Sequence, residues 1–165
     1  MAAIAHEMPP TLPDSLTRLD FDAWRDIRFR QERALFAPQA QAGQPPSGQA
    51  SGAGGPFRMQ MFHPGFLFNQ AVTVNIIRDG VPTPVPYAAA MFDYGRTKFD
   101  KSLPVNLGFA GFRLHHQLNQ PKVFDELISF IGASYFRVLG RGQKYGLSAR
   151  GLGINAGIKD GEEFP

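Results

Sequence analysis

The stretch Phe57–Ile76, FRMQMFHPGFLFNQAVTVNI, determines the fold class that we expect for this chain. Apolar and polar side chains alternate over residues 57–61 and again over residues 72–76. A period of two is the pattern of a β-strand with one buried face. The pair Asp79-Gly80 follows directly and is typical of a tight hairpin turn. The stretch therefore predicts two strands leading into a hairpin, and an all-β fold class for the chain.

The residues after the hairpin repeat this pattern in short pieces. Further β-like runs, separated by glycines, are Val105–Leu114, Leu127–Ile131, Tyr135–Leu139 and Tyr145–Ile154. The 18 glycines and 14 prolines among 165 residues also favour short elements joined by turns. Val81–Pro86 contains three prolines and is expected only at a sheet edge or in a loop. Asp125–Phe130 fits either a strand or a helical turn, and the sequence leaves both open.

The part of the chain before residue 57 differs from this β-rich part. Asp14 and Ser15 are candidate helix caps, and the apolar spacing in Asp20–Phe29 predicts a short leading helix that passes into an extended segment. Residues 37–56 contain only Ala, Pro, Gln, Gly and Ser, and so bury too little surface to offset the entropy of ordering. We therefore expect a lead-in over residues 1–36, a flexible insertion over 37–56 and β-strands over 57–165.

Composition and charge exclude several classes of protein. The net charge is only +3, from 17 Lys and Arg against 14 Asp and Glu, and it is dispersed, which argues against a nucleic-acid partner. No run of 18 apolar residues exists, so no membrane span is expected. The absence of cysteine excludes disulfides, thiolate metal ligands and a cysteine nucleophile. Residues 1–13 show no signal peptide, which fits a cytosolic protein or a processed or re-engineered start.

Motifs for nucleotide binding, nucleophilic catalysis and metal binding are incomplete. Gly140–Gly146 has the spacing GxGxxxG and runs into β-like residues, whereas a dinucleotide loop opens a helix. Ser134 and Ser148 each begin a sequence like the GxSxG elbow but lack its final glycine. His115 and His116 are adjacent, so on a strand they point to opposite faces and share a metal only across a bulge. We therefore expect no metal site and no cofactor.

The segment Ser134–Arg150, SYFRVLGRGQKYGLSAR, interleaves aromatic side chains with planar hydrogen-bonding groups. Carbohydrate clefts use this mixture because sugars present apolar C–H faces as well as hydroxyls. An ordinary pair of exposed strands has the same composition, so the sequence does not distinguish a sugar-binding surface from such a pair. The candidates for sugar contact are Tyr135, Arg137, Gln143, Tyr145 and Arg150, with His63 and Asp93 as additional choices.

Several of these strings together resemble one family, the osmoregulated periplasmic glucan biosynthesis proteins of the G and D types. In family order, the resemblance rests on Leu19–Phe29, Met61–Phe68, Phe92–Gly95, Leu107–His115, Ile131–Gly151 (above all) and Glu162–Pro165. The segment over residues 37–56 departs from the family pattern and looks like an insertion that is peculiar to this sequence. Because members of the family are several times longer, the resemblance implies that the chain is an N-terminal fragment.

The resemblance also implies a fold and a function. The fold is the N-terminal part of a large galactose-mutarotase-like β-sandwich, which in the family precedes an immunoglobulin-like domain. The function is periplasmic, and consists in binding or processing the β-1,2-linked glucan backbone that a membrane glucan glucosyltransferase makes. Some members resemble inverting glycoside hydrolases of β-1,2-glucan. The alternative is a non-catalytic carbohydrate-binding or scaffold protein that assists the glucosyltransferase.

The catalytic carboxylates that the family implies lie beyond residue 165. No catalytic residue is therefore assigned here, and the 165 residues alone are expected to be inactive. A glycosidase needs two carboxyl groups at a defined separation, which sequence does not supply. If these residues alone released sugar, Asp93, Asp125 and Glu126 would be the carboxylates to substitute first.

Overall fold

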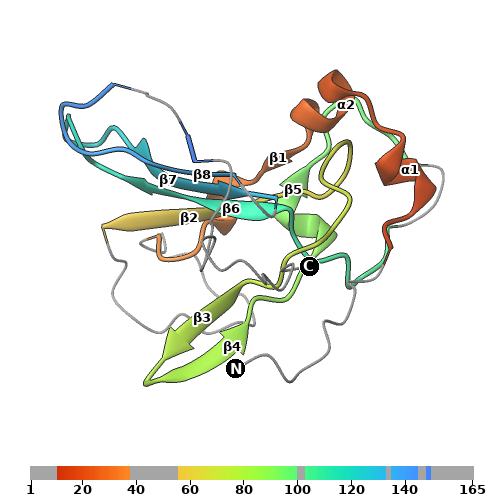
Figure 1. The fold of residues 1–165 in the computed structure, drawn as a ribbon, viewed down its shortest axis with the longest axis horizontal. Helices are drawn as coiled ribbons and strands as arrows, with labels where there is room; N and C mark the ends of the chain where they lie inside the picture. Colours follow the sequence, from red (N-terminus) through yellow and green to blue (C-terminus); the bar gives the residue numbers. More distant parts are fainter. Residues whose placement is uncertain (1–10, 38–55, 100–102, 133–134, 145–147, 150–165) are drawn as a thin grey trace, which may run out of the picture.

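The computed structural model of the chain describes residues 11–37, 56–99, 103–132, 135–144 and 148–149. Its main element is an antiparallel four-stranded sheet with the strand order β2-β6-β7-β8. These strands are β2 (Phe57–Phe62), β6 (Gly111–His116), β7 (Asp125–Ile131) and β8 (Tyr135–Val138). Figure 1 shows this sheet at one end of the molecule and the helices at the other.

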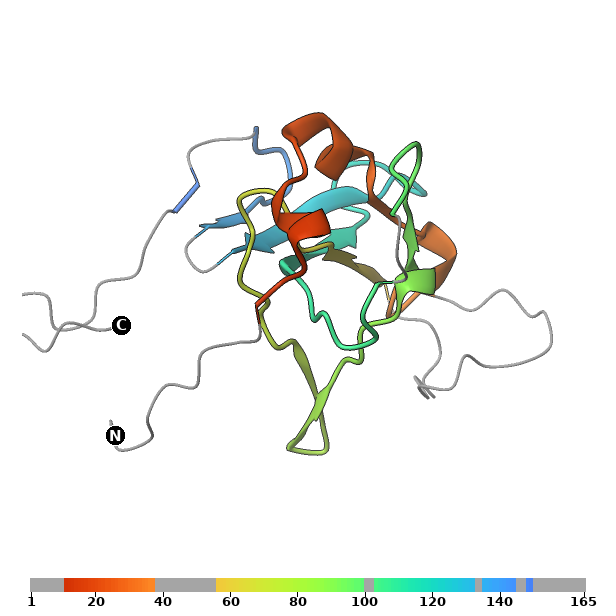
Figure 2. The same ribbon diagram turned by 90° about the vertical axis from the view of Figure 1, so that its right-hand side faces the viewer.

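Two small antiparallel sheets accompany the main sheet. One pairs β1 (Arg28–Phe29) with β5 (Phe92–Asp93), and the other is a hairpin of β3 (Asn75–Arg78) and β4 (Val81–Pro84). The hairpin points away from the rest of the described chain in both Figure 1 and Figure 2. With short helices only, the chain is all-β, as the alternation predicted. The galactose-mutarotase-like sandwich and the three-part division of the chain remain predictions.

The helical elements are short, and the single leading helix that we expected is two helices. They are α1 (Asp14–Thr17), α2 (Phe21–Asp26) and the 3-10 turns η1 (Gln31–Arg33) and η2 (Ala89–Met91). The Asp20 side chain accepts a hydrogen bond of 2.8 Å from the Ala23 N–H and so starts α2 separately. The predicted caps Asp14 and Ser15 are wrong, because α1 begins at Asp14 directly after Pro13 without a side-chain cap.

The strands predicted over residues 57–61, 127–131 and 135–139 appear where the sequence placed them, whereas the run Val105–Leu114 forms a strand only from Gly111, and this strand ends at His116. The turn at Asp79-Gly80 is confirmed, and both residues have positive φ, 50° and 79°, as a two-residue hairpin turn of type I′ requires. Asp125–Phe130, which the sequence left open, belongs to a strand. The strand predicted over residues 72–76 begins only at Asn75. Of the run Tyr145–Ile154, the described part includes a bridge from Ala149 to Phe136, and the remainder lies outside the described residues.

The core packs against one face of the main sheet. Met59 and Met61 of β2 lie opposite Leu114 and Phe112 of β6, so these four side chains share a face. The buried residues of this core are Leu12, Leu16, Ile27, Phe29, Met59, Met61, Val74, Tyr87, Phe92, Leu107 and Phe109. They come from α1 and the residues that flank the two helices, from β1, β2 and β5, and from the segments before β3, after β4 and before β6. Burial on this face therefore holds the N-terminal part against the sheet.

Candidate functional site

The face of the main sheet opposite the core carries a row of polar side chains. Gln60 on β2 lies opposite Arg113 on β6, Arg113 opposite Ser129 on β7, and Ser129 opposite Arg137 on β8. Residues directly opposite in neighbouring strands point to the same face, so the four form one row across the sheet. We call this surface the polar face and define it by Arg58, Gln60, Arg113, His115, Glu126, Ser129, Tyr135 and Arg137.

A β-bulge brings Glu126 to the polar face. Leu114 pairs with Ile128, but the next residue, His115, pairs with Glu126, so β7 holds one extra residue at this point. In a regular strand, Glu126 and Ile128, two residues apart, would both point to the core face. The bulge therefore reverses the direction of the Glu126 side chain relative to a regular strand.

Glu126 joins the two arginines of the row. The Arg137 Nη2 donates a hydrogen bond to Glu126 Oε1, and Arg113 Nη1 lies 3.8 Å from Glu126 Oε2. Arg113 Nε also donates a hydrogen bond of 3.1 Å to Gln60 Oε1. The side chains of Arg113, Glu126 and Arg137 are 33%, 16% and 24% exposed. The network fixes two guanidinium planes at the surface of the sheet while leaving part of each accessible.

Arg58 adds a third guanidinium group to the polar face. It stacks on the ring of Phe124, with its guanidinium carbon 3.7 Å from the ring centroid. Burial lowers the pKa of Arg113, and the charge of Glu126 opposes that shift. Burial, together with the charge of Arg113, lowers the pKa of His115, so this imidazole is mainly neutral at pH 7. The polar face thus combines three guanidinium groups with one carboxylate.

The structure brings two of the seven predicted sugar-contact residues to this face. Tyr135 and Arg137 lie two residues apart on β8 and therefore point the same way. Gln143 lies in the turn after β8, where its side-chain oxygen accepts a hydrogen bond of 2.8 Å from the Gly140 N–H. Tyr145 and Arg150 lie outside the described residues. His63 and Asp93 lie elsewhere in the fold.

The sequence interpretation missed Gln60, Arg113, Glu126 and Ser129 as neighbours of Arg137. Residues 60 and 113 are polar positions within alternating strands, so a solvent-side location was readable from the pattern. Their side-by-side placement was not readable, since β2 and β6 are separated by about fifty residues of sequence. The bulge that turns Glu126 outward left no distinctive sequence pattern.

His63 follows β2 and is buried, with 3% of its surface exposed. Its Nδ1 lies 2.7 Å from the Pro64 carbonyl oxygen and its Nε2 lies 3.0 Å from the Tyr87 hydroxyl. A carbonyl only accepts, so Nδ1 carries the proton and Tyr87 donates to Nε2 of the neutral ring. The Tyr94 hydroxyl lies 3.1 Å from that of Tyr87 and extends the chain of hydrogen bonds. Burial raises the pKa of both tyrosines.

The environment of His63 makes the stability of the chain depend on pH. Burial lowers the pKa of His63 from 6.5 to about 4, against the opposing effect of the Pro64 carbonyl. The unfolded state therefore takes up a proton below pH 6.5 that the folded state does not bind until about pH 4. We expect the free energy of unfolding to fall by about 3 kcal/mol between these pH values from this group alone.

Urea unfolding at a series of pH values from 7.5 to 4.5 measures this effect. The control is His63→Gln, which removes the titrating ring. For this variant, the slope of the free energy of unfolding against pH is expected to be smaller than for the native chain. The difference corresponds to the uptake of up to one proton on unfolding. The contribution of His115, whose pKa is also lowered, is common to both proteins. Equal slopes for the two proteins would contradict the assignment.

Asp93 lies on β5 and is exposed, and its side-chain oxygen accepts a hydrogen bond of 3.0 Å from the Gly95 N–H. This is the geometry of a turn that follows a short strand. The register places Asp93 opposite Arg28 in the small β1–β5 sheet. Asp93 is therefore separated from the polar face, which belongs to the main sheet.

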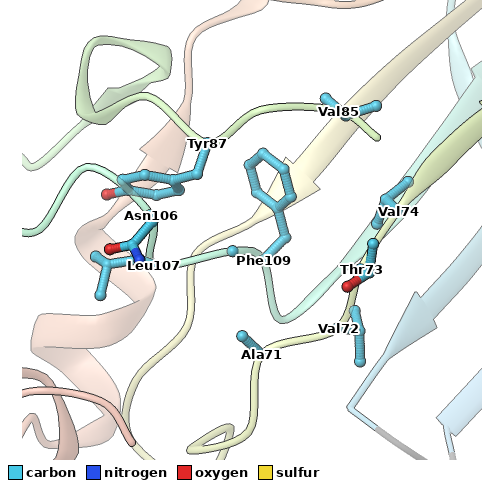
Figure 3. Close-up of a pocket in the computed structure, with 10 residues that line it drawn as sticks. Ala71, Val72, Thr73, Val74, Val85, Tyr87, Asn106, Leu107 and Phe109 are labelled. Atoms are coloured by element: carbon cyan, nitrogen blue, oxygen red, sulfur yellow. The ribbon is translucent and has the colours of Figure 1, made fainter. Parts of the chain in front are cut away.

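A hollow of about 240 Å³ lies beside the base of the hairpin. Figure 3 shows its lining, which comes from the segments over residues 71–74, 85–87 and 106–109. The lining is mostly apolar, with Thr73 and Asn106 as its polar side chains. The Tyr87 ring forms part of the wall, while its hydroxyl is engaged with His63. A hydroxyl-rich ligand would find few hydrogen-bonding side chains in this hollow. The polar face is therefore the better candidate for a sugar-binding site.

Among the described residues, no three His, Asp or Glu side chains are grouped closely enough to hold a metal ion. The helices described here are too short and too polar to cross a membrane.

The Glu126 carboxylate is expected to stabilise the fold measurably. Glu126→Gln leaves two partly buried guanidinium groups close together without their shared counter-charge, so we expect the free energy of unfolding to fall by about 1–2 kcal/mol. Asp22→Asn is the matched control, because its ion pair with Arg25, 3.4 Å long, is 67% and 78% exposed. Urea unfolding measures both changes. A loss for Glu126→Gln no larger than for the control would contradict the network.

The fold and the polar face define an all-β protein with a network of arginine, glutamine and glutamate on one sheet face. The whole chain, residues 1–165, matches the family described as "Periplasmic glucan biosynthesis protein, MdoG". It is 41% identical over 166 residues to "Glucans biosynthesis protein G" of Ralstonia nicotianae and 42% identical over 168 residues to the protein of that name from Rhodopseudomonas palustris. Both alignments cover 100% of this chain and 30% of the relative.

The chain therefore belongs to the periplasmic glucan biosynthesis protein family. A third relative, "Glucans biosynthesis protein G" of Vibrio cholerae, is 41% identical over 155 residues, which are 93% of this chain and 26% of that protein. The resemblance read from the sequence strings is confirmed, and the family description confirms the periplasmic location. The chain spans about 30% of the length of the Ralstonia and Rhodopseudomonas relatives.

Proposed function

We propose that the polar face binds β-1,2-linked glucan, and that the whole protein is a glycoside hydrolase that processes this glucan. The observation that carries the proposal is the hydrogen-bond and ion-pair network of Gln60, Arg113, Glu126 and Arg137 on one sheet face of a chain from a glucan biosynthesis family. Tyr135, two residues from Arg137, adds an aromatic ring to the same face.

The chemistry of the polar face suits a sugar polymer. Guanidinium, amide and carboxylate groups have fixed planes of donors and acceptors that match neighbouring hydroxyls on a sugar ring. An aromatic ring covers the apolar C–H face of a pyranose. The network around Glu126 holds these groups in place before a ligand binds, which reduces the entropy cost of binding. The proposal extends to Gln143, Tyr145 and Arg150 on their sequence alone.

A second candidate function is binding without catalysis, as a scaffold that assists the membrane glucan glucosyltransferase. One observation favours it. Glu126 is the one carboxylate of the polar face within the described residues, and two arginines engage it. Because a glycosidase needs two carboxyl groups at a suitable separation, hydrolysis requires carboxylates from elsewhere in the whole protein. No catalytic residue is assigned among residues 1–165.

The first experiment incubates the whole protein with linear β-1,2-glucan and measures new reducing ends. Release of sugars supports the hydrolase, with the 165 residues alone expected to remain inactive. Binding of glucan without new reducing ends would replace the hydrolase by the scaffold. Neither binding nor release would contradict both functions.

Two substitutions test whether the polar face is the binding surface. Tyr135→Ala removes the ring, and Arg137→Lys keeps the charge but removes the planar pair of donors. Each is expected to weaken glucan binding about 10-fold, which corresponds to about 1.4 kcal/mol. Arg18→Ala, directly after α1, is the control, since the Arg18 side chain is 80% exposed and lies outside the polar face. Calorimetry or affinity electrophoresis with β-1,2-glucan measures the change. Affinities equal to that of the control would contradict this location.

A further inference from the structure

His63, Tyr87 and Tyr94 form a small cluster of hydrogen-bonding side chains in the core. His63 directly follows β2, Tyr87 lies between β4 and η2, and Tyr94 directly follows β5. His63 and Tyr87 are 3% and 8% exposed, and Tyr94 is half-buried. Among the described residues, the Tyr87 hydroxyl bonds only to His63 Nε2, at 3.0 Å, and to the Tyr94 hydroxyl, at 3.1 Å. The cluster therefore joins the end of β2 to the segments before and after β5.

The neutral imidazole sets the direction of every hydrogen bond in the cluster. His63 Nδ1 donates to the Pro64 carbonyl oxygen, so Nε2 is a bare acceptor and the Tyr87 hydroxyl donates to it. A tyrosine hydroxyl has one proton, so Tyr87 accepts from Tyr94. The single proton of Tyr94 is thereby directed into the cluster. Toward any group outside the cluster, the Tyr94 hydroxyl offers only lone pairs and acts as an acceptor.

A second proton on His63 reverses this order. Protonated Nε2 is a donor, and its nearest acceptor is the Tyr87 oxygen, since the Tyr94 oxygen lies farther away, at 3.5 Å. Tyr87 must then turn its proton from Nε2 to the Tyr94 oxygen, which is its only other partner in the described part of the chain. Tyr94 in turn directs its proton out of the cluster. Both tyrosines keep their O–H bonds, and the net change is one proton gained at Nε2.

Charged side chains do not compete with the hydroxyls for the imidazole. Helix α2 contacts His63 through Trp24, whose Nε1 donates to the His63 carbonyl oxygen, and β5 contacts it through Phe92. The charged residues of α2, of β5 and of the loop after Tyr94 are Asp22, Arg25, Asp26, Asp93, Arg96 and Lys98. None of the ion pairs among the described residues includes His63. The Arg96 N–H lowers the pKa of Asp26, so this carboxylate stays mainly ionised above pH 4.

We propose that His63, Tyr87 and Tyr94 are a proton-driven switch, which converts the Tyr94 hydroxyl from an acceptor into a donor toward its surroundings when His63 is protonated. The tyrosine rings meet the imidazole edge-on, at 5.8 and 5.5 Å, and only their hydroxyl protons need to turn. Burial places the pKa of His63 at about 4, so the switch responds to acid. Both tyrosines stay protonated there, because burial raises their pKa. The switch does not depend on glucan binding by the polar face.

Tyr94→Phe tests the reversal. Phenylalanine keeps the ring but leaves the Tyr87 proton without an acceptor once His63 is protonated. A buried donor left unpaired disfavours the protonated form, so the acid dissociation constant of His63 is expected to rise about 10-fold. At pH 4, about one half of the native imidazoles and about one tenth of those in the variant then carry the second proton. Nitrogen NMR of the whole protein, labelled at histidine, measures this in sucrose, which favours the folded state.

Phe99→Leu is the matched control for Tyr94→Phe. The Phe99 ring meets the Tyr94 ring edge-on at 5.6 Å, so this substitution changes the packing around Tyr94 but keeps its hydroxyl. The dissociation constant of His63 is expected to stay near its native value in this variant. A native dissociation constant in Tyr94→Phe would overturn the proposal, and so would an equal rise in both variants.

A second measurement follows the output of the switch at Tyr94. The NMR signal of Cζ, the carbon that bears the hydroxyl, responds to the direction of hydrogen bonding. In the native protein, the Tyr94 signal is expected to shift with the same midpoint as His63. His63→Gln is the comparison, because glutamine still offers an acceptor to Tyr87 but does not titrate. An equal shift in this variant, or a native Tyr94 signal that does not follow His63, would disprove the switch, whatever the outcome for glucan binding.

Discussion

Replacing Gly111 by alanine is expected to reduce the free energy of unfolding by about 4 kcal/mol, because the new methyl group has no space in the sheet. Gly111 begins β6, has a φ of 146° and lies opposite Ile131 of β7. An added Cβ would lie 2.1 Å from the Phe130 carbonyl oxygen and 2.9 Å from the Ile131 Cα. Both are backbone atoms, so relief requires β6 and β7 to separate at the centre of the main sheet.

Gly80→Ala is the matched control for this prediction. Gly80 also has a positive φ, 79°, but no atom lies within 4 Å of an added Cβ. The alanine variant therefore has backbone strain at position 80 but no steric clash. This strain is expected to reduce the free energy of unfolding by about 1 kcal/mol. Urea unfolding of both variants separates the steric effect from the strain. Similar losses for the two variants would show that the close approach of β6 and β7 at Gly111 is wrong.

Phe92→Ala is expected to destabilise the chain by about 4 kcal/mol, through lost apolar contact and the cavity left behind. Phe92 is 1% exposed. Its ring meets Phe29 edge-on at 5.3 Å and His63 edge-on at 4.8 Å, and stacks on Tyr87 at 5.9 Å. It therefore joins the small β1–β5 sheet to the end of β2, and its loss loosens both.

The same substitution has a second readout at His63. Water that enters the space left by the Phe92 ring would hydrate the imidazole, so the pKa of His63 is expected to rise from about 4 toward 6.5. Urea unfolding measures the stability, and the NMR signals of the imidazole follow the pKa. Phe21→Ala is the control, because Phe21 is 50% exposed and lies on α2. A stability loss equal to that of the control would contradict the position of Phe92 in the core.

Local sequence was sufficient for the strands and the hairpin. The alternation over residues 57–61 predicted β2 and its buried side, since both depend on neighbouring residues of one strand. Asp79-Gly80 predicted the turn because few residue pairs adopt positive φ at two successive positions. The helix caps were misassigned because several residues near Asp14 can accept a hydrogen bond, and the choice among them depends on how the chain enters the helix.

The candidate site was predictable only in its β8 part. Tyr135 and Arg137 were found because they alternate within one short strand of mixed aromatic and polar composition. Gln60 and Arg113 join them through cross-strand pairing between distant segments, which periodicity does not encode. His63 was chosen for its place beside Pro64-Gly65, but the packing of Phe92, Tyr87 and Tyr94 around it decided its burial.

The sequence by itself therefore determined the all-β class, the hairpin and the membership in the periplasmic glucan biosynthesis family, because these follow from local periodicity, turn chemistry and characteristic strings. Only the tertiary structure decided that β2 lies beside β6 and that a bulge turns Glu126 toward Arg113 and Arg137. The physical reason is that a strand's own residues specify which side is buried, whereas its partner and register depend on the free energy of packing the whole sheet against the core.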